Sequence, residues 1–368
     1  MAERGFALAL VMSMAAAAGC VEQPPPRASA PAARQDSPPS APARSASDSP
    51  PPAQSAASEP ASEASPPIDF APRLAAVRSD PAPPATTRGR HYFTSNERNP
   101  ELFRDAVSNL GGIVVGVGAE QMYLLGGWAK ATALVLTDFD DFIVDLHEVY
   151  GTLFMKHDNI EAFMNAWQYR SQGEVKAALE ARFPEHAQRW RKTRSFGEAG
   201  AEVRKRLTVL RSRFLKAGIK SFLTDDEEYG HLRKLWLDGR VRAVRGDLTQ
   251  DRTLADVGKL GRETSTPIRV LYLSNAEDYF SFSTRHYRAN VLALPFDDKS
   301  VVLRTRPHHG SEYDYVVQSG VGFQSWLRAG EVPTMCELVR FADRQGDSEL
   351  YRLERAPGSS RVRDYLCD

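Results

Sequence analysis

The chain has 368 residues, with 47 basic and 47 acidic side chains and a formal net charge of zero. This neutral balance argues against nucleic acid as the main partner. The sequence contains no Cys-x-x-Cys or His-x-x-x-His pattern and no Gly-x-Ser-x-Gly elbow. The sequence therefore predicts no metal site and contains no motif that would support hydrolase chemistry.

Residues 1–19 have the features of an export signal. Arg4 precedes an apolar run over residues 6–18, and small residues stand directly before Cys20. This pattern is similar to a bacterial lipobox, which predicts cleavage before Cys20 and lipidation of that cysteine. Val21 follows the cysteine in place of the aspartate that retains many lipoproteins in the inner membrane, so we expect an outer-membrane anchor. A cytoplasmic protein whose start only resembles a signal is the alternative.

Residues 20–88 are predicted to be a disordered tether. The tract holds 17 of the 24 prolines of the chain, among many Ala and Ser residues, and cannot bury a core. Residues 89–368 are long enough for one large domain. We therefore expect a soluble domain that is attached to the membrane through a lipid.

Residues 111–140 carry the strongest fold signal. Ile113 to Val115 form a β-branched run of the kind buried in a parallel sheet, and Gly116 and Gly118 would let the backbone turn and approach a ligand. A helix is predicted over residues 119–131, and a second strand over 133–136. This is the opening βαβ half of a nucleotide-binding, Rossmann-like fold.

Asp138 ends the second strand, twenty residues after Gly118, where a carboxylate can accept hydrogen bonds from ribose hydroxyls. Asp140 and Asp141 are fallback candidates for that role. The turn lacks the third glycine of the dinucleotide fingerprint, which favours S-adenosylmethionine, a cofactor without a pyrophosphate. A tight strand-to-helix turn without any ligand is the alternative.

A helical insertion is predicted over about residues 145–236, too long for an ordinary crossover. Its basic side chains form either a solvated helix face or a contact with anionic lipid headgroups. They are Arg182, Arg189, Arg191, Lys192, Arg194, Arg204, Lys205, Arg206, Arg211 and Arg213.

Further strands are predicted over residues 240–244, 268–273 and 301–305, with a late run over 313–318 that pairs antiparallel at the edge or between the last strands. Alternating strands and helices imply a mostly parallel sheet with a ligand crevice beyond the carboxyl ends of the strands. Asp247 follows the third strand, where it would contact an adenine amino group. A turn or helix-capping role for Asp247 is equally compatible with its position.

His308 and His309 follow the fifth strand, so an imidazole there would act as a general base near the crevice or lie on plain surface. Cys336 and Cys367 either form a disulfide that ties the C-terminus down or remain thiols.

The segments GGIVVGVGAEQ, LYLSNAEDYF and HYFTSNERN resemble a family of uncharacterised bacterial proteins, many of them lipoproteins, with an S-adenosylmethionine-dependent methyltransferase-like fold. The resemblance covers roughly residues 89–330. The Ser-Asn-Ala-Glu-Asp-Tyr segment is also similar to the strand ends of aminocarboxypropyl transferases, which use the same cofactor. The resemblance implies a fold and leaves the activity open.

Together these observations predict S-adenosylmethionine or a related nucleoside as the small-molecule ligand. The cofactor-binding candidates are Gly116, Gly118, Glu120, Asp138, Asp247, Ser274 and Asn275. The substrate candidates are Asn96, Glu97, Glu277, Tyr279 and His308. Because this cofactor is made in the cytosol, an exported domain would not normally meet it. Either the export signal is misread, or the domain is a non-catalytic surface lipoprotein that uses the fold to bind another ligand or partner.

Overall fold

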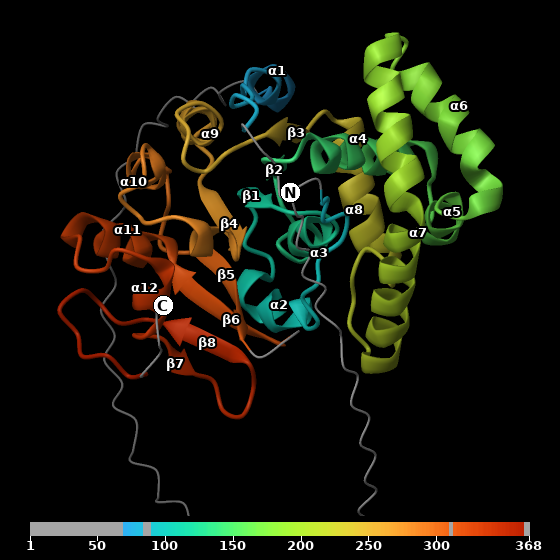
Figure 1. Ribbon diagram of the computed structural model, residues 1–368. Coiled ribbons are helices and arrows are strands. Elements are labelled where there is room, and N and C mark those ends of the chain that lie inside the picture. Colours follow the sequence, from blue (N-terminus) through green and yellow to red (C-terminus); the bar gives the residue numbers. More distant parts are fainter. Residues whose placement is uncertain (1–68, 84–89, 309–311, 364–368) are drawn as a thin grey trace, which may run out of the picture. The chain divides into compact units, whose positions relative to one another are not determined.

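The computed structural model describes residues 69–83, 90–308 and 312–363. Cys20, His309, Cys367 and most of the predicted tether lie outside these residues. Within them the protein is an α/β fold built on one eight-stranded, mostly parallel sheet with helices on both faces (Figure 1). This arrangement confirms the predicted α/β class and is compatible with a Rossmann-like fold.

The sheet has the strand order β3-β2-β1-β4-β5-β6-β8-β7. Neighbouring strands run parallel except in two pairs, β5 with β6 and β7 with β8. The chain leaves β1 toward β2 and β3 and later returns to the other side of β1 with β4, which creates a topological switch point between β1 and β4. The strands are β1 (Ile113–Val117), β2 (Ala133–Asp138), β3 (Val241–Arg245), β4 (Ile268–Ser274), β5 (Val301–His308), β6 (Glu312–Ser319), β7 (Asp343–Arg344) and β8 (Leu350–Leu353).

Two apolar cores lie on opposite faces of the sheet, because successive side chains of a strand point to opposite faces. Val114 packs into one core, and its neighbours Ile113 and Val115 pack into the other. The first core holds α2 (Arg104–Val107) with η2 (Pro100–Phe103), α3 (Gln121–Trp128), and the insertion helices. The second holds α1 (Phe70–Ala75), α9 (Thr253–Glu263), α10 (Tyr287–Leu292), α11 (Gly320–Ala329) and α12 (Met335–Val339).

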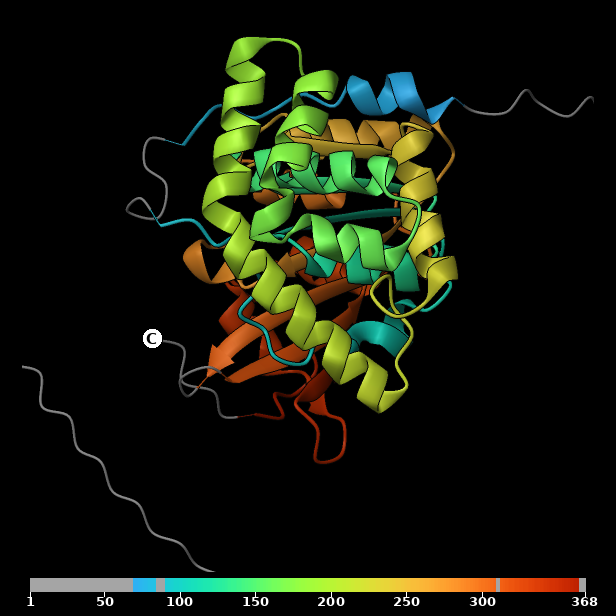
Figure 2. The same ribbon diagram turned by 90° about the vertical axis from the view of Figure 1, so that its right-hand side faces the viewer.

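The stretch between β2 and β3 consists of helices, of which α7 is the longest at 32 residues. Helix α7 packs on α4, and α8 packs on both α3 and α4 (Figures 1 and 2). The insertion thus covers one face of the sheet and adds a lobe to it. Its elements are α4 (Asp141–Lys156), α5 (Ile160–Ala166), η3 (Tyr169–Ser171), α6 (Gln172–Arg182), α7 (His186–Ala217) and α8 (Asp226–Leu237).

Residues 69–83 correct the predicted extent of the tether. The sequence predicts disorder here, but Asp69 caps helix α1 by accepting a hydrogen bond from the Ala71 amide. Phe70, Leu74 and Val77 are buried in the second core. Phe70 and Leu74 have the four-residue spacing of a helix, but two residues are too few to stand out from the Pro- and Ala-rich composition.

Candidate functional site

A pocket of about 510 Å³ opens at the carboxyl ends of β1 to β4. Seven of the twelve predicted ligand-site residues line it: Asn96, Gly118, Asp138, Asp247, Ser274, Asn275 and Tyr279. They converge because the ends of parallel strands meet at one edge of the sheet. Residues that the sequence did not single out complete the wall, among them Pro83, Phe139 and Tyr313.

A buried histidine, His147, forms a hydrogen bond to the turn that follows β1. Gly118 has a φ of +89°, which favours glycine, and its carbonyl accepts a 2.8 Å hydrogen bond from His147 Nε2. Burial lowers the pKa of His147 to about 4, so the ring is neutral at neutral pH. Its Nδ1 then accepts a hydrogen bond from the Tyr123 hydroxyl at 3.1 Å. The pair fixes the carbonyl of the turn.

Gly116 has a different role from the one predicted. It lies inside β1 and does not line the pocket. A Cβ there would stand 2.6 Å from Met122 Sδ and 2.7 Å from Tyr272 Cβ. Gly116 therefore allows β1, β4 and α3 to approach one another, and only Gly118 belongs to the turn beside the pocket.

Asp138 lies on the pocket wall at the end of β2. Its two carboxylate oxygens accept hydrogen bonds from the Gly118 amide at 3.2 Å and the Asp140 amide at 2.9 Å. Burial, followed by the neighbouring charge of Asp140, raises the pKa of Asp138 to about 7. Because the carboxylate lies on the pocket wall, a ligand hydroxyl can donate to it.

The two fallback aspartates differ in position. Asp140 lines the pocket, caps α4 by accepting from the Phe142 amide, and accepts a 2.6 Å hydrogen bond from His91 Nδ1. Asp141 does not line the pocket and forms an ion pair with Arg245 at 2.7 Å.

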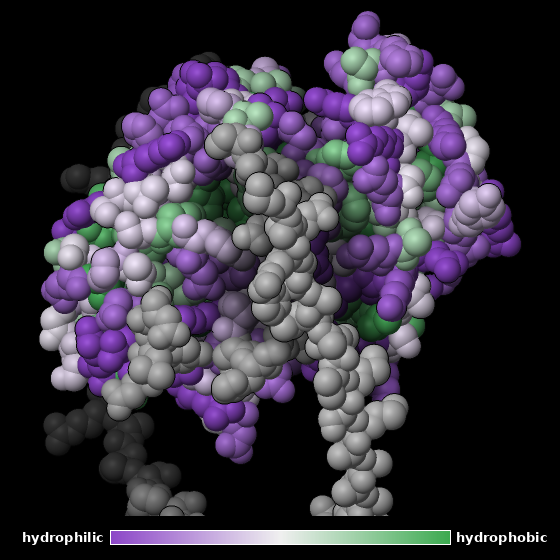
Figure 3. All heavy atoms as spheres, viewed as in Figure 1, coloured by the Kyte–Doolittle hydropathy of each residue, from purple (hydrophilic) through white to green (hydrophobic). Residues whose placement is uncertain are grey.

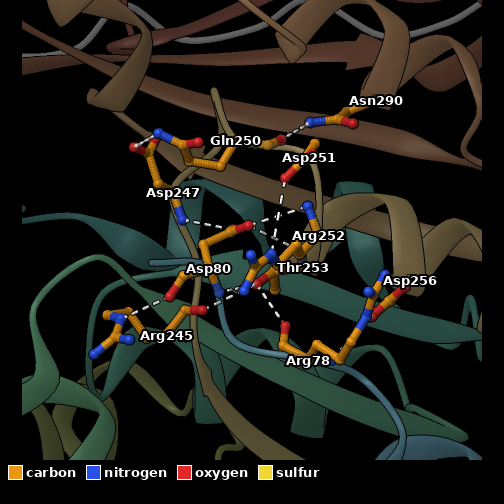
Figure 4. Close-up of polar contacts among 10 residues, drawn as sticks. All are labelled: Arg78, Asp80, Arg245, Asp247, Gln250, Asp251, Arg252, Thr253, Asp256 and Asn290. Carbon is orange, nitrogen blue, oxygen red and sulfur yellow. Dashed lines mark hydrogen bonds and ion pairs between the residues drawn. The ribbon is translucent and has the colours of Figure 1, made fainter. Parts of the chain in front are cut away.

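Asp247 has the turn role that the sequence allowed, and its predicted contact with an adenine amino group stays a prediction. One carboxylate oxygen accepts hydrogen bonds from the Thr249 amide at 2.9 Å and the Thr249 hydroxyl at 2.8 Å, which makes it a turn residue. The residue also lines the pocket. Its own amide donates to Asp80 Oδ2 at 3.0 Å, a contact that is drawn in Figure 4 and has no signal in the sequence.

Ser274 and Asn275 form the end of β4. Ser274 has a φ of +50°, a conformation that a serine adopts only when its surroundings hold it there. Its hydroxyl donates to Glu97 Oε1 at 2.8 Å. The side-chain amide of Asn275 has no hydrogen-bond partner among the described residues, so it is available to a ligand.

Three of the predicted acidic candidates are buried away from the pocket, which corrects their assignment. Glu97 accepts hydrogen bonds from the hydroxyls of Tyr272, Ser274 and Thr305, and burial raises its pKa. Glu97 thus holds Ser274, which lines the pocket, but does not line the pocket itself.

Glu120 and Glu277 are the other two. Glu120 pairs with Arg206 at 2.7 Å and accepts from the Ser95 amide, which joins α7 to the segment along the pocket rim. Glu277 forms a fully buried ion pair with Arg304 and accepts from the Tyr287 hydroxyl. Neither carboxylate is free to bind a ligand.

The rim of the pocket is aromatic. Tyr279, Tyr92 and Phe139 line the pocket and are 81%, 50% and 38% exposed. Asn96 also lies on the wall and hydrogen-bonds to Tyr313. His308 ends β5, where its backbone pairs with Glu312 across the hairpin, and the structure does not describe its side chain.

Basic residues of the insertion are mostly paired with carboxylates. Eight of the ten have an acidic partner within 4.0 Å, and Arg204 and Lys205 are the exceptions within the described chain. In the view of Figure 3, the lobe formed by α6 and α7 is predominantly hydrophilic. The paired charges favour a solvated face over a lipid-binding one.

Cys336 is disulfide-bonded and therefore not a free thiol. Among the described residues no helix is long and apolar enough to cross a membrane. The same residues contain no group of three His, Cys, Asp or Glu side chains suited to a metal ion.

The fold and the pocket define an α/β protein with a concave site at the carboxyl ends of its parallel strands. The chain belongs to the family described as domain of unknown function DUF7790, whose model matches residues 92–361. No curated protein matches the chain.

Proposed function

We propose that this protein is an exported, lipid-anchored domain of the methyltransferase-like type that binds S-adenosylmethionine or a related nucleoside in the pocket. One observation carries the proposal: the ends of four parallel strands bring Gly118, Asp138, Asp247 and Asn275 together around a space of about 510 Å³. The strand order β3-β2-β1-β4-β5, with an antiparallel β6 beside β5, supports a doubly wound nucleoside-binding fold.

The charge of the lining supports a ligand without phosphate groups. Asp138, Asp140 and Asp247 line the pocket, and none of the described lining residues is Lys, Arg or His. Phosphates require such cations or a free helix N-terminus, and the Gly118 amide is already bonded to Asp138. A nucleoside that carries ribose hydroxyls and a sulfonium suits these carboxylates better than a nucleotide does.

The cell envelope is the proposed location. The lipobox-like sequence before Cys20 and the Pro-rich tract support an anchored protein, with the outer membrane as the proposed site. A disulfide at Cys336 supports an oxidising compartment. The anchor would be the lipid on Cys20, because the basic side chains of the insertion are largely paired.

A second candidate function is non-catalytic binding. The pocket lining has no described His, Lys or Cys to act as a base, and its aspartates hold local turns. A surface lipoprotein that binds a nucleoside-like ligand or a partner would need no more than this. Turnover separates the two candidates: a transferase converts S-adenosylmethionine to S-adenosylhomocysteine when envelope components are supplied as acceptors, and a binding protein leaves it unchanged.

Calorimetric titration of S-adenosylmethionine into the purified full chain tests the proposal. We expect micromolar affinity, weakened at least tenfold in Asp138→Asn because the amide keeps only one acceptor oxygen. Asp141→Asn is the matched control, since Asp141 pairs with Arg245 outside the pocket and its loss should leave affinity unchanged. ATP should bind much more weakly. If the folded wild-type protein gives no heat of binding in this titration, the proposal is wrong.

A further inference from the structure

The described N-terminal segment, residues 69–83, lies outside the range that matches the family and yet reaches the pocket. Its helix α1 packs Phe70 and Leu74 into the second core. The Arg78 guanidinium forms two hydrogen bonds to Asp256 in α9, at 2.8 and 2.9 Å. Pro83, at the end of the segment, is itself part of the pocket wall.

Asp80 makes the most extensive contacts of this segment, and its side chain is fully buried. One oxygen accepts hydrogen bonds from the amides of Arg252 at 3.1 Å and Thr253 at 3.3 Å. The other accepts from the Asp247 amide at 3.0 Å. Figure 4 shows these contacts converging on the loop between β3 and α9.

The loop that Asp80 holds is a wall of the pocket. Gly246, Asp247 and Leu248 line the pocket, and α9 begins directly after the loop. The residue before α9, Arg252, provides no side-chain cap. Asp80 supplies that cap from a distant part of the chain and, with its second oxygen, fixes the backbone at Asp247.

We propose that Asp80 is a positioning residue of the pocket, so that docking of residues 69–83 and occupancy of the pocket are thermodynamically linked. A ligand that contacts the Asp247 wall binds best when this wall is held in place by Asp80. By reciprocity, the same ligand strengthens the docking of the segment that joins the domain to its tether. The ligand part of this inference rests on the proposed function, and the positioning part does not.

Asp80→Asn in the full chain is the diagnostic change. The asparagine keeps one acceptor oxygen, which we expect to stay with the two amides of Arg252 and Thr253, because that orientation saves two bonds. The amide NH₂ then faces the Asp247 amide, a second donor, so that bond is lost. We expect S-adenosylmethionine to bind about tenfold more weakly.

Amide hydrogen exchange supplies a readout that needs no ligand. In Asp80→Asn, the Asp247 amide should exchange at least about tenfold faster, while the amides of β1 keep their protection and show that the fold is intact. Asp256→Asn is the control: it weakens the Arg78 contact of the same segment without touching the pocket wall. Because Asp80 still holds the loop in this control, exchange at Asp247 and ligand affinity should change much less than in Asp80→Asn. In the wild type, saturating S-adenosylmethionine should slow exchange over residues 69–80.

The outcomes separate the two proposals. If the wild type binds S-adenosylmethionine and Asp80→Asn binds it equally well, the linkage is overturned. If the wild type binds no ligand, the proposed function fails, and the positioning role is decided by exchange alone. Faster exchange at Asp247 then supports the positioning role, and unchanged exchange overturns it.

Discussion

If the proposed ligand binds at Asp138, its affinity depends on pH in a defined direction. The pKa of Asp138 is raised to about 7, and ligand hydroxyls that donate to this carboxyl favour the charged form. Affinity for S-adenosylmethionine should therefore rise with pH through 7, and fall about tenfold per unit below pH 6. Titration at pH 5.5, 6.5, 7.5 and 8.5 measures this. The same slope in Asp138→Asn would show that another group binds the proton, and a flat wild-type profile would show that ligand binding is not linked to a proton at Asp138.

The same shift affects the stability of the ligand-free protein. A carboxyl whose pKa is raised in the folded state contributes stability below its ordinary value near 3.8, and loses that contribution as pH rises through about 7. A bound ligand that donates hydrogen bonds to the carboxylate offsets this loss. Ligand-induced stabilisation should accordingly be larger above pH 7 than below it.

At single positions, the sequence predicted the pocket residues at the strand ends correctly, but it wrongly placed three glutamates in the pocket. Gly118, Asp138, Asp247 and Asn275 follow strands whose order was readable, and strand ends converge by geometry alone. Glu97 was misplaced because its burial depends on hydroxyls of β4 and β5, which are distant in sequence. Asp80 was missed for the same reason: no local pattern reveals a carboxylate that caps a remote loop.

Packing between elements gives a sharp test at Gly116. An added methyl group would press on Met122 in α3 and on the backbone oxygen of Tyr272 in β4. We expect Gly116→Ala to lower the free energy of unfolding by about 1–3 kcal/mol, measured by urea denaturation. Gly173→Ala is the control, since nothing lies within 4 Å of its Cβ position in α6. That variant should be neutral or slightly stabilising. Equal losses in both variants would contradict the packing argument.

Elements with a clear period were predictable, and short ones were not. The runs that became β1, β2, β4 and β6 are apolar or alternate over five or more residues. Strands β7 and β8 have only two and four residues, too few for a periodic signal. Strand β8 forms by pairing with the edge of β6, and β7 then pairs with β8. Tertiary pairing, not local sequence, creates them.

For the molecule as a whole, the folded domain begins earlier than composition suggests. A chain that begins at Ser65 should unfold like the full-length protein, because all described contacts remain. A chain that begins at Arg90 removes Phe70, Leu74 and Val77 from the second core and removes Asp80. We expect its free energy of unfolding to fall by about 3 kcal/mol or more, measured by urea denaturation. Equal stability of the two chains would show that residues 69–83 contribute nothing to the domain.

Some contacts within the domain join residues that are far apart in the sequence. The Glu97 carboxylate accepts from Thr305, 208 residues away, and the Asn99 side chain donates to Glu349, 250 residues away. Such pairings form only after long loops have closed, which is slow and comes late in folding. A chain that emerges in order from the ribosome therefore lacks a complete pocket until β6, which carries the lining residue Tyr313, has been made. A ligand of the pocket would therefore be taken up in the compartment in which folding ends, not in the one in which synthesis begins.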